Sequence, residues 1–292
     1  MRWWPSQRSA ILLALVGLLA FMPGQQASQS ASAAPRTFVS LTFDDGQLSH
    51  YSTLSMLASR GMVGTYYINS AMVGSSWYYM TWWQIRALAA AGNEIGGHTL
   101  RHANLPDTDP VNAQREVCVD RQNLIDRGFA PVTSFAYPEA AVNPAAEKIV
   151  RQCGYLTARS AGNLYSDGVC RGCPYAETIP PADAFNLSTP EPAGTSTTLS
   201  QLKSYVTDAE THGGGWVILN FHGICNNGCT AENSLPTGTF TAFLDWLKSR
   251  EDDGTVVRTV GQVIGPPPPA PPQSTPSAPT GPPHHVCSGA WR

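Results

Sequence analysis

Residues 37–46 read TFVSLTFDDG, an apolar stretch that stops at two adjacent aspartates and a glycine. Its apolar part, Phe38–Phe43, is short and predicts a buried β-strand. Six further stretches of the same kind follow along the chain: Val63–Asn69, Glu94–Gly97, Val132–Tyr137, Tyr155–Ala158, Trp216–Phe221 and Val256–Val260.

Helical patterns separate most of these predicted strands. One pattern follows Thr81, with Gln84 three residues later, which is the capping-box signature of a helix start. The helical patterns are His50–Arg60, Trp82–Ala91, Val111–Arg127, Pro144–Gln152, Leu199–Thr211 and Phe240–Ser249. Strands and helices that alternate in this way indicate an α/β fold with a parallel sheet. Seven or eight repeats favour closure into a TIM-barrel-like (β/α)7–8 barrel.

Polar residues stand where several predicted strands end. Asp44 and Asp45 close the first strand, His98 follows the third and His222 follows the sixth. In a parallel α/β barrel the functional residues lie at this end of the strands. We therefore expect these side chains to meet on one rim of the barrel.

The first residues have the layout of an export signal. Arg2 and Arg8 give a positive start, Ala10–Met22 is an unbroken run of small or apolar residues, and an Ala-Ser-Ala sequence ends at Ala33. The run is shorter than the roughly 20 residues that a membrane span needs. We predict a signal peptide over residues 1–33, cleaved after Ala33. An uncleaved membrane anchor is the alternative interpretation.

Residues 265–292 form a proline-rich tail. Ten of the residues from Pro266 to Pro283 are proline, and this composition favours extended polyproline II over a packed core. The tail is typical of a wall-spanning spacer, and a disordered tail without a role is the alternative. Residues 37–264 remain, which is enough for one sizeable core.

Charge and cysteine content narrow the class of protein. The formal net charge is −3 and no basic stripe is present, which argues against nucleic acid as a partner. Cysteines in an exported chain favour disulfides, although their connectivity is open. The short pairs Cys170/Cys173 and Cys225/Cys229 suit small loops, Cys118 and Cys153 lie in neighbouring helical patterns, and Cys287 is left over. A four-cysteine zinc site made from the two short pairs is the alternative.

Two histidines and an aspartate form a candidate metal site. His98 and His102 are four residues apart, and on a helical turn this spacing places both imidazoles on one face. Two neutral imidazoles and one carboxylate, from Asp45, would make a three-ligand zinc site with an open position. A pair of surface histidines without a metal is the alternative.

The neighbouring Asp44 and His222 are candidates for proton transfer. Asp44 is next to the proposed ligand Asp45 but need not bind the metal itself, so it could accept a proton from water. His222 stands at the end of an apolar strand and could protonate a leaving group. A simple Asp-Asp-Gly turn and a hydrogen-bonded structural histidine are the alternatives.

Together these residues resemble the polysaccharide deacetylases of carbohydrate esterase family 4, the NodB-homology domain. The resemblance covers roughly residues 37–264 and rests on two motifs, Thr42–Gly46 (TFDDG) and His98–His102 (HTLRH). It implies a deformed (β/α)7–8 barrel with Asp45, His98 and His102 as metal ligands. It also implies Asp44 as general base and His222 as general acid.

The other family motifs are weaker. The third, R-x-P-[YF], corresponds to Ala136-Tyr137-Pro138-Glu139, which lacks the arginine that braces the base. Arg159, at the end of the fifth predicted strand, is a candidate replacement. Tyr137 and Glu139 are candidates for the oxyanion and substrate side, with the Glu139 backbone N–H as the donor. The fourth motif is not found. The fifth, L-x-H, corresponds to Asn220-Phe221-His222. Asn220 replaces the leucine of the motif, which affects the expected shape of the acetyl pocket more than the expected chemistry.

Aromatic residues after the second predicted strand could form a saccharide platform. Trp77 and Tyr78 are the better candidates, because they lie in a loop. Core packing is the alternative interpretation, and we favour it for Trp82 and Trp83, which stand in a helical pattern.

These observations predict a secreted or cell-wall-associated deacetylase that acts on the N-acetyl or O-acetyl groups of a chitin-like glycan, peptidoglycan or xylan. Zinc is the favoured metal, and cobalt or nickel could occupy the same site. We expect a monomer with no membrane span after signal cleavage. The alternatives are a carbohydrate-binding scaffold that has lost catalysis and a metal-dependent hydrolase of a small amide.

Overall fold

A computed structural model describes residues 37–226 and 231–265. Its centre is β1 (Thr37–Phe43), which pairs in parallel with β7 (Gly215–Phe221) on one side. On the other side β1 pairs in parallel with β10 (Thr255–Val257) at its start and with β2 (Thr65–Ile68) at its end. The sheet continues from β2 through β3 (Glu94–Gly97), β4 (Ser134–Ala136), β5 (Thr157–Asn163) and β6 (Leu187–Thr189).

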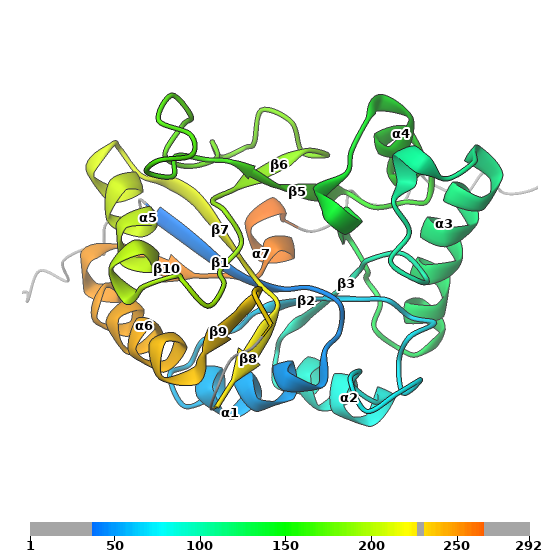
Figure 1. The fold of residues 1–292 in the computed structure, drawn as a ribbon, viewed down its shortest axis with the longest axis horizontal. Coiled ribbons are helices and arrows are strands. Elements are labelled where there is room, and N and C mark those ends of the chain that lie inside the picture. The colour runs from blue at the N-terminus through cyan, green and yellow to red at the C-terminus, as the bar shows by residue number, and fades with distance from the viewer. Residues whose placement is uncertain (1–36, 227–230, 266–292) are drawn as a thin grey trace, which may run out of the picture. The chain divides into compact units, whose positions relative to one another are not determined.

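This eight-stranded parallel sheet curls into a deformed half-barrel (Figure 1). The predicted α/β barrel class is therefore confirmed. The helices are α1 (Thr53–Ala58), α2 (Trp82–Ala90), α3 (Pro110–Asp126), α4 (Pro144–Gln152), α5 (Leu199–Thr211), α6 (Thr237–Ser249) and α7 (Val260–Ile264). Helices α1 to α6 lie along the outer face of the sheet, and α7 packs against the apolar side chains inside the curl. Two short strands outside the sheet, β8 (Gly223–Cys225) and β9 (Ser234–Pro236), pair with each other.

The two faces of the strands have different environments. Val39, Leu41 and Phe43 of β1 pack in the main core with the buried side chains of the surrounding helices. Successive side chains of a strand point to opposite faces, so the even-numbered residues of β1 and β7 face the inside of the curl. A small inner cluster lies there, made of Leu187, Trp216, Ile218 and Val260.

Several element boundaries differ from the sequence predictions. The predicted helix His50–Arg60 begins as a 3-10 turn, η1 (Leu48–Ser52), before α1. The predicted strand Val256–Val260 ends at Val257, because Thr259 caps α7 with its side chain. The predicted strand Tyr155–Ala158 starts later, at Thr157, and runs on to Asn163. The capping box at Thr81 and Gln84 is present as predicted.

Disulfides join Cys118 to Cys153 and Cys170 to Cys173. The first ties α3 to α4, and the second closes a small loop after β5. The hypothesis of a four-cysteine zinc site is therefore wrong, because Cys170 and Cys173 are bonded to each other. Cys229 and Cys287 lie outside the described residues, as do the predicted signal peptide and the proline-rich tail. Within the described ranges, no helix has the length and apolar character that a membrane crossing requires.

Candidate metal centre

The three predicted ligands converge at the carboxyl ends of β1 and β3. The ligand atoms of Asp45, His98 and His102 all lie within 4.8 Å of one another. Each histidine places Nε2 3.4 Å from Oδ1 of Asp45. Asp45 and His102 both adopt positive φ angles, 72° and 62°, and this sparsely populated backbone region is typical of functional turns.

The environment of these side chains fits a bound cation. Nδ1 of His98 lies 2.7 Å from the carbonyl oxygen of Ala136. Because that nitrogen must donate to the carbonyl, the Nε2 lone pair remains free for a ligand. Oδ1 of Asp45 is buried and has no hydrogen-bond partner among the described residues. Two imidazoles and a carboxylate with an unsatisfied oxygen are a suitable donor set for a divalent metal.

Protein contacts hold the carboxylate of Asp45 in this position and in its ionised form. Its other oxygen, Oδ2, accepts a hydrogen bond of 3.1 Å from Nε2 of Gln47. Burial opposes ionisation, but the adjacent imidazole of His98 outweighs it and holds the pKa of Asp45 well below its usual value. An ionised carboxylate is the form that binds metal.

Helix α3 braces the loop that carries the two histidines. Asp120 accepts the backbone N–H of His98 at 3.1 Å and that of Ser70 at 2.8 Å. Glu116, one turn earlier on α3, accepts the backbone N–H of Arg101 at 3.0 Å. Neither carboxylate was predicted from the sequence to support the site. One sequence pattern could have identified Asp120, because it follows Val117 by three residues and so lies on the apolar stripe of α3. In the structure Asp120 is fully buried.

A second group of polar side chains lies beside the ligands. Asp44, at the end of β1, forms a buried ion pair with Nη2 of Arg159 from β5. Nε2 of His222, after β7, lies 4.0 Å from Oδ2 of Asp44. Burial raises the pKa of Asp44, but the charges of Arg159, His98 and His222 outweigh it, so the pKa stays below its usual value. Asp44 is therefore an ionised carboxylate that lies near the imidazole of His222.

Arg159, the candidate replacement for the missing motif arginine, contacts the carboxylate of Asp44. Its guanidinium carbon lies 4.9 Å from the centroid of the Tyr67 ring, which supports the planar group inside the curl. Only 1% of Arg159 and 3% of Asp44 are exposed. This burial strengthens the attraction between the two charges, because little water screens them.

The residues of the third motif have two different environments. Glu139 adopts a left-handed conformation, with φ 57°, within the 3-10 turn η3 (Pro138–Ala140). Its exposed side chain accepts a hydrogen bond from Asn104 at 2.9 Å. Tyr137 is buried, and its hydroxyl donates to the carbonyl oxygen of Phe185 at 3.0 Å. Its side chain is thus occupied in the core, and its backbone positions the turn.

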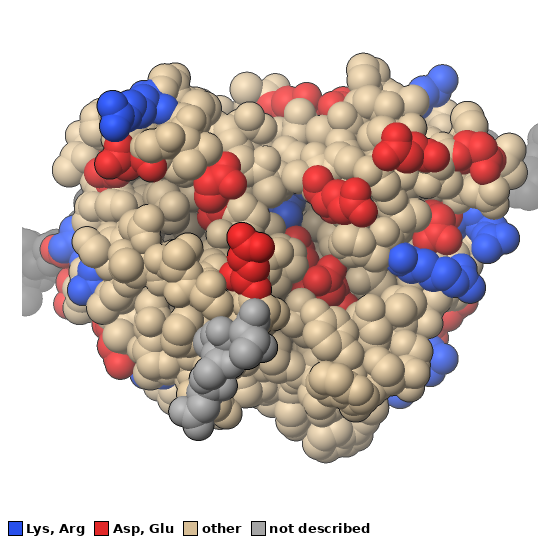
Figure 2. Space-filling model, viewed as in Figure 1, with Lys and Arg blue, Asp and Glu red and all other residues tan. Residues whose placement is uncertain are grey.

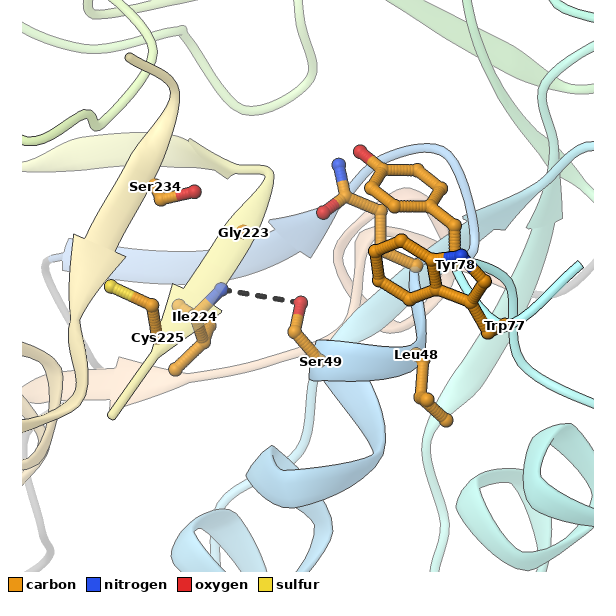
Figure 3. A pocket seen from close by; sticks show the side chains of 9 residues that line it. Leu48, Ser49, Trp77, Tyr78, Gly223, Ile224, Cys225 and Ser234 are labelled. Carbon is orange, nitrogen blue, oxygen red and sulfur yellow. Dashed lines mark hydrogen bonds between the residues drawn. The ribbon is translucent and has the colours of Figure 1, made fainter. Parts of the chain in front are cut away.

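A pocket of about 360 Å³ lies next to the metal ligands. Trp77 and Tyr78 line one side and Ile224 of β8 lines the other, where its backbone N–H donates to Oγ of Ser49 (Figure 3). Trp77 is 84% exposed and Tyr78 is 41% exposed. Gln47, which also bonds Asp45, completes the link between this pocket and the ligand set.

The other aromatics of this region differ in their packing. Trp82 is half-buried and stacks on Phe129, as the core interpretation predicted. The same interpretation is wrong for Trp83, which is 67% exposed and contacts Tyr51 at the surface. Acidic side chains gather around a hollow near the centre of the face in Figure 2, and most basic side chains lie at its periphery.

Comparisons with known proteins agree with this geometry. A family model described as polysaccharide deacetylase matches residues 31–158. A chitin deacetylase of Pestalotiopsis sp. is 37% identical over 81 residues, which are 27% of this chain and 26% of that relative. The chain thus covers about a quarter of that relative's length.

Two solved structures share the fold. A family 4 acetyl xylan esterase from Clostridium thermocellum, in complex with a cobalt ion, has a TM-score of 0.52 at 18% identity. The Xyl-CE4 domain of a multidomain xylanase from the hindgut metagenome of Trinervitermes trinervoides has a TM-score of 0.51 at 18% identity. Each similarity covers 78% of this chain and 90% of the other. Residues 31–158 of this chain are thus similar to the polysaccharide deacetylase family, and the chain shares the fold of these two solved structures.

Proposed function

We propose that this chain is a metal-dependent hydrolase that removes acetyl groups from a polysaccharide. The observation that carries the proposal is the single rim on which Asp45, His98 and His102 converge beside Asp44 and His222. This arrangement supports binding a cation on one side of a reacting carbonyl and moving protons on the other. The similarity of residues 31–158 to the polysaccharide deacetylase model supports an acetylated glycan as the substrate.

Each residue of the site has its own role in the proposed reaction. A divalent cation held by Asp45, His98 and His102 would supply a Lewis acid that polarises the acetyl carbonyl and acidifies water. Asp44, kept ionised by Arg159, takes a proton from the attacking water. The backbone N–H of Glu139 donates to the oxyanion that develops on the carbonyl oxygen. His222 protonates the departing nitrogen or oxygen.

Zinc is the first candidate for the metal, because two imidazoles and a carboxylate with an open position are typical of catalytic zinc. Cobalt is a close second, since the related acetyl xylan esterase structure contains it. Nickel could use the same donors.

Trp77 and Tyr78 support a saccharide chain as the substrate. Their exposed rings border the pocket beside the ligands, where a sugar next to the reacting one could stack. The relative named a chitin deacetylase makes an N-acetylated glycan the first candidate among chitin-like glycan, peptidoglycan and xylan. The predicted signal peptide over residues 1–33 and the predicted spacer over 265–292 support a location of the proposed catalytic domain, residues 37–264, outside the cell or at its wall.

The test is acetate release by the mature chain from acetylated chitooligosaccharides, peptidoglycan fragments and xylan, together with a small chromogenic acetate ester. Release from one glycan class supports the proposal and identifies the substrate. Turnover of the small ester alone would favour a small-substrate hydrolase. Glycan binding without any release, with zinc bound, would favour a scaffold that has lost catalysis.

A further inference from the structure

Asn220 lies on the inner face of β7, two residues before His222. Asn220 is opposite Thr42 of β1 in the parallel register, as Phe221 is opposite Phe43. Both phenylalanines point to the outer face, where each packs against Phe240 of α6. The alternation of strand side chains therefore directs Asn220 inward, to the face that carries His222 and Asp44.

Asn220 separates the apolar interior from the polar site. Ile218, two residues earlier on the same face, belongs to the buried inner cluster with Leu187 and Trp216. His222, two residues later, stands at the rim beside Asp44. Two residues of strand correspond to roughly 7 Å, so Asn220 lies one layer below the proton-transfer groups. It is thus a floor residue of the site.

The side chain of Asn220 lacks a partner in this position. Only 4% of the residue is exposed, and its Oδ1 has no hydrogen-bond partner among the described residues. Thr42, which lies opposite Asn220 in the register, does have a hydrogen-bond partner. The Thr42 hydroxyl donates to the carbonyl oxygen of Leu219 at 2.9 Å. Nε of Arg159, the ion-pair partner of Asp44, is likewise buried and has no hydrogen-bond partner among the described residues. An unsatisfied acceptor and an unsatisfied donor therefore remain inside the curl.

The unpaired Oδ1 of Asn220 and Nε of Arg159 affect which acyl group the site accepts. The glycan must stay on the solvent side, so the substituent of the acyl carbon points inward, toward the floor. A methyl group on the acyl carbon would exclude water and leave Oδ1 of Asn220 without a hydrogen bond. An unpaired buried acceptor of this kind has a desolvation cost. A hydroxyl group is both donor and acceptor and can pair with such groups.

We propose that Asn220 makes this site selective for acyl groups with a hydroxyl on the carbon next to the carbonyl, so that N-glycolyl sugars are preferred to N-acetyl sugars. This inference rests on the proposed function. Water adds its oxygen to the acyl carbon, the carbon–nitrogen bond breaks, glycolate leaves, and the sugar nitrogen takes a proton. The hydroxyl takes no part in the chemistry and serves recognition alone.

The test compares kcat/KM for N-glycolyl and N-acetyl glucosamine oligomers of equal length, with glycolate and acetate measured as products. The ratio of the two constants does not depend on how much of a preparation is folded. Asn220→Leu is the main variant, because leucine has a similar size and cannot form a hydrogen bond. Ile218→Leu, on the same face one layer lower, is the matched control.

We expect the wild-type chain to favour the glycolyl substrate by roughly tenfold to a hundredfold, the range that an unpaired buried polar group corresponds to. Asn220→Leu should lower this ratio at least tenfold, and Ile218→Leu should leave it unchanged. A wild-type preference for acetyl, or a ratio that Asn220→Leu does not change, overturns the inference and leaves the proposed function standing. Release of neither acid by zinc-loaded protein overturns both.

Discussion

Nη2 of Arg159 pairs with Oδ1 of Asp44 across 115 residues of sequence, and both side chains are almost completely buried. Strands β5 and β1 bring the two residues together inside the curl, although the strands are not neighbours in the sheet. The pair gives the aspartate a fixed orientation and a counter-charge. It therefore links the packing of the barrel to the chemistry at its rim.

Removing the arginine should harm both stability and turnover. Breaking a buried ion pair by removing one partner costs about 3–5 kcal/mol, since the other charge is left unpaired. We expect Arg159→Ala to lose roughly that much free energy of unfolding in urea and to turn over at least tenfold more slowly with zinc still bound. The control is Arg171→Ala, whose ion pair with Asp167 is exposed and should contribute under about 1 kcal/mol. Equal effects of the two substitutions would contradict a special role for Arg159.

Asp120 should control metal affinity without touching the metal. Its carboxylate holds the backbone N–H groups of His98 and Ser70, and outer contacts of this kind commonly contribute about tenfold to a hundredfold in affinity. We expect Asp120→Asn to weaken zinc binding at least tenfold in a competition titration. Asp126→Asn, at the exposed end of the same helix, should bind zinc like the wild type. Unchanged affinity in Asp120→Asn would show that the loop holds its shape alone.

His50 should make the fold less stable in mild acid. It is fully buried, and Nε2 lies 2.5 Å from the carbonyl oxygen of His222. Burial lowers the pKa of His50 to about 4, although that hydrogen bond and the charges of Asp45 and Asp44 oppose the shift. The unfolded chain, with a pKa near 6.5, binds the proton first as the pH falls. The stabilising contribution is therefore complete above about pH 6.5 and is lost progressively toward pH 4.

The measurement is the free energy of unfolding in urea at pH 7 and pH 5. This histidine should account for a loss of roughly 2 kcal/mol between the two, at about 1.36 kcal/mol per pH unit. His50→Gln keeps a donor for the His222 carbonyl and does not titrate, so it should show a smaller difference between the two pH values. If the variant and the wild type lose the same stability, other groups cause the acid sensitivity.

Trp77 and Tyr78 should affect polymers more than small substrates. Their rings border the pocket beside the ligand set, where they would contact sugars next to the reacting one, which a small ester lacks. We expect the double substitution to Ala to raise KM for an oligosaccharide severalfold, with kcat/KM for a chromogenic acetate ester unchanged. Trp83→Ala, an exposed tryptophan outside that pocket, is the control. An unchanged oligosaccharide KM would remove both aromatics from the binding surface.

Local patterns in the sequence predicted the fold and the three side chains that converge at the candidate metal centre. The apolar stretch before Asp44 is a property of a short segment, and short-range physics determines it. Helix starts such as Thr81 were predictable for the same reason. His98 and His102 do converge, but not on the helical turn that their spacing suggested, because Thr99 and His102 adopt positive φ angles. The ends of the strands then placed the ligands on one rim, because all strands of a parallel sheet run in the same direction.

The remaining features depend on contacts between distant segments. The position of Asp120 on the apolar stripe of α3 indicates burial, but its hydrogen bonds depend on how α3 packs beside the histidine loop. The unpaired state of Asn220 depends on its neighbours in the curl, which the sequence does not specify. The prediction that Trp83 packs in the core was wrong, because a position in a helix does not by itself determine whether a side chain faces the core. Strand β6 is only three residues long, too short for a recognisable apolar pattern.

The most direct test of the proposed mechanism measures acetate release and zinc content together, in the wild type and in Asp44→Asn. The wild type should release acetate from an acetylated glycan, stop when zinc is chelated and resume when zinc is returned. Asp44→Asn should bind zinc with the same stoichiometry and release no acetate above background. Wild-type release that chelation does not reduce, or full release by zinc-loaded Asp44→Asn, would contradict the account.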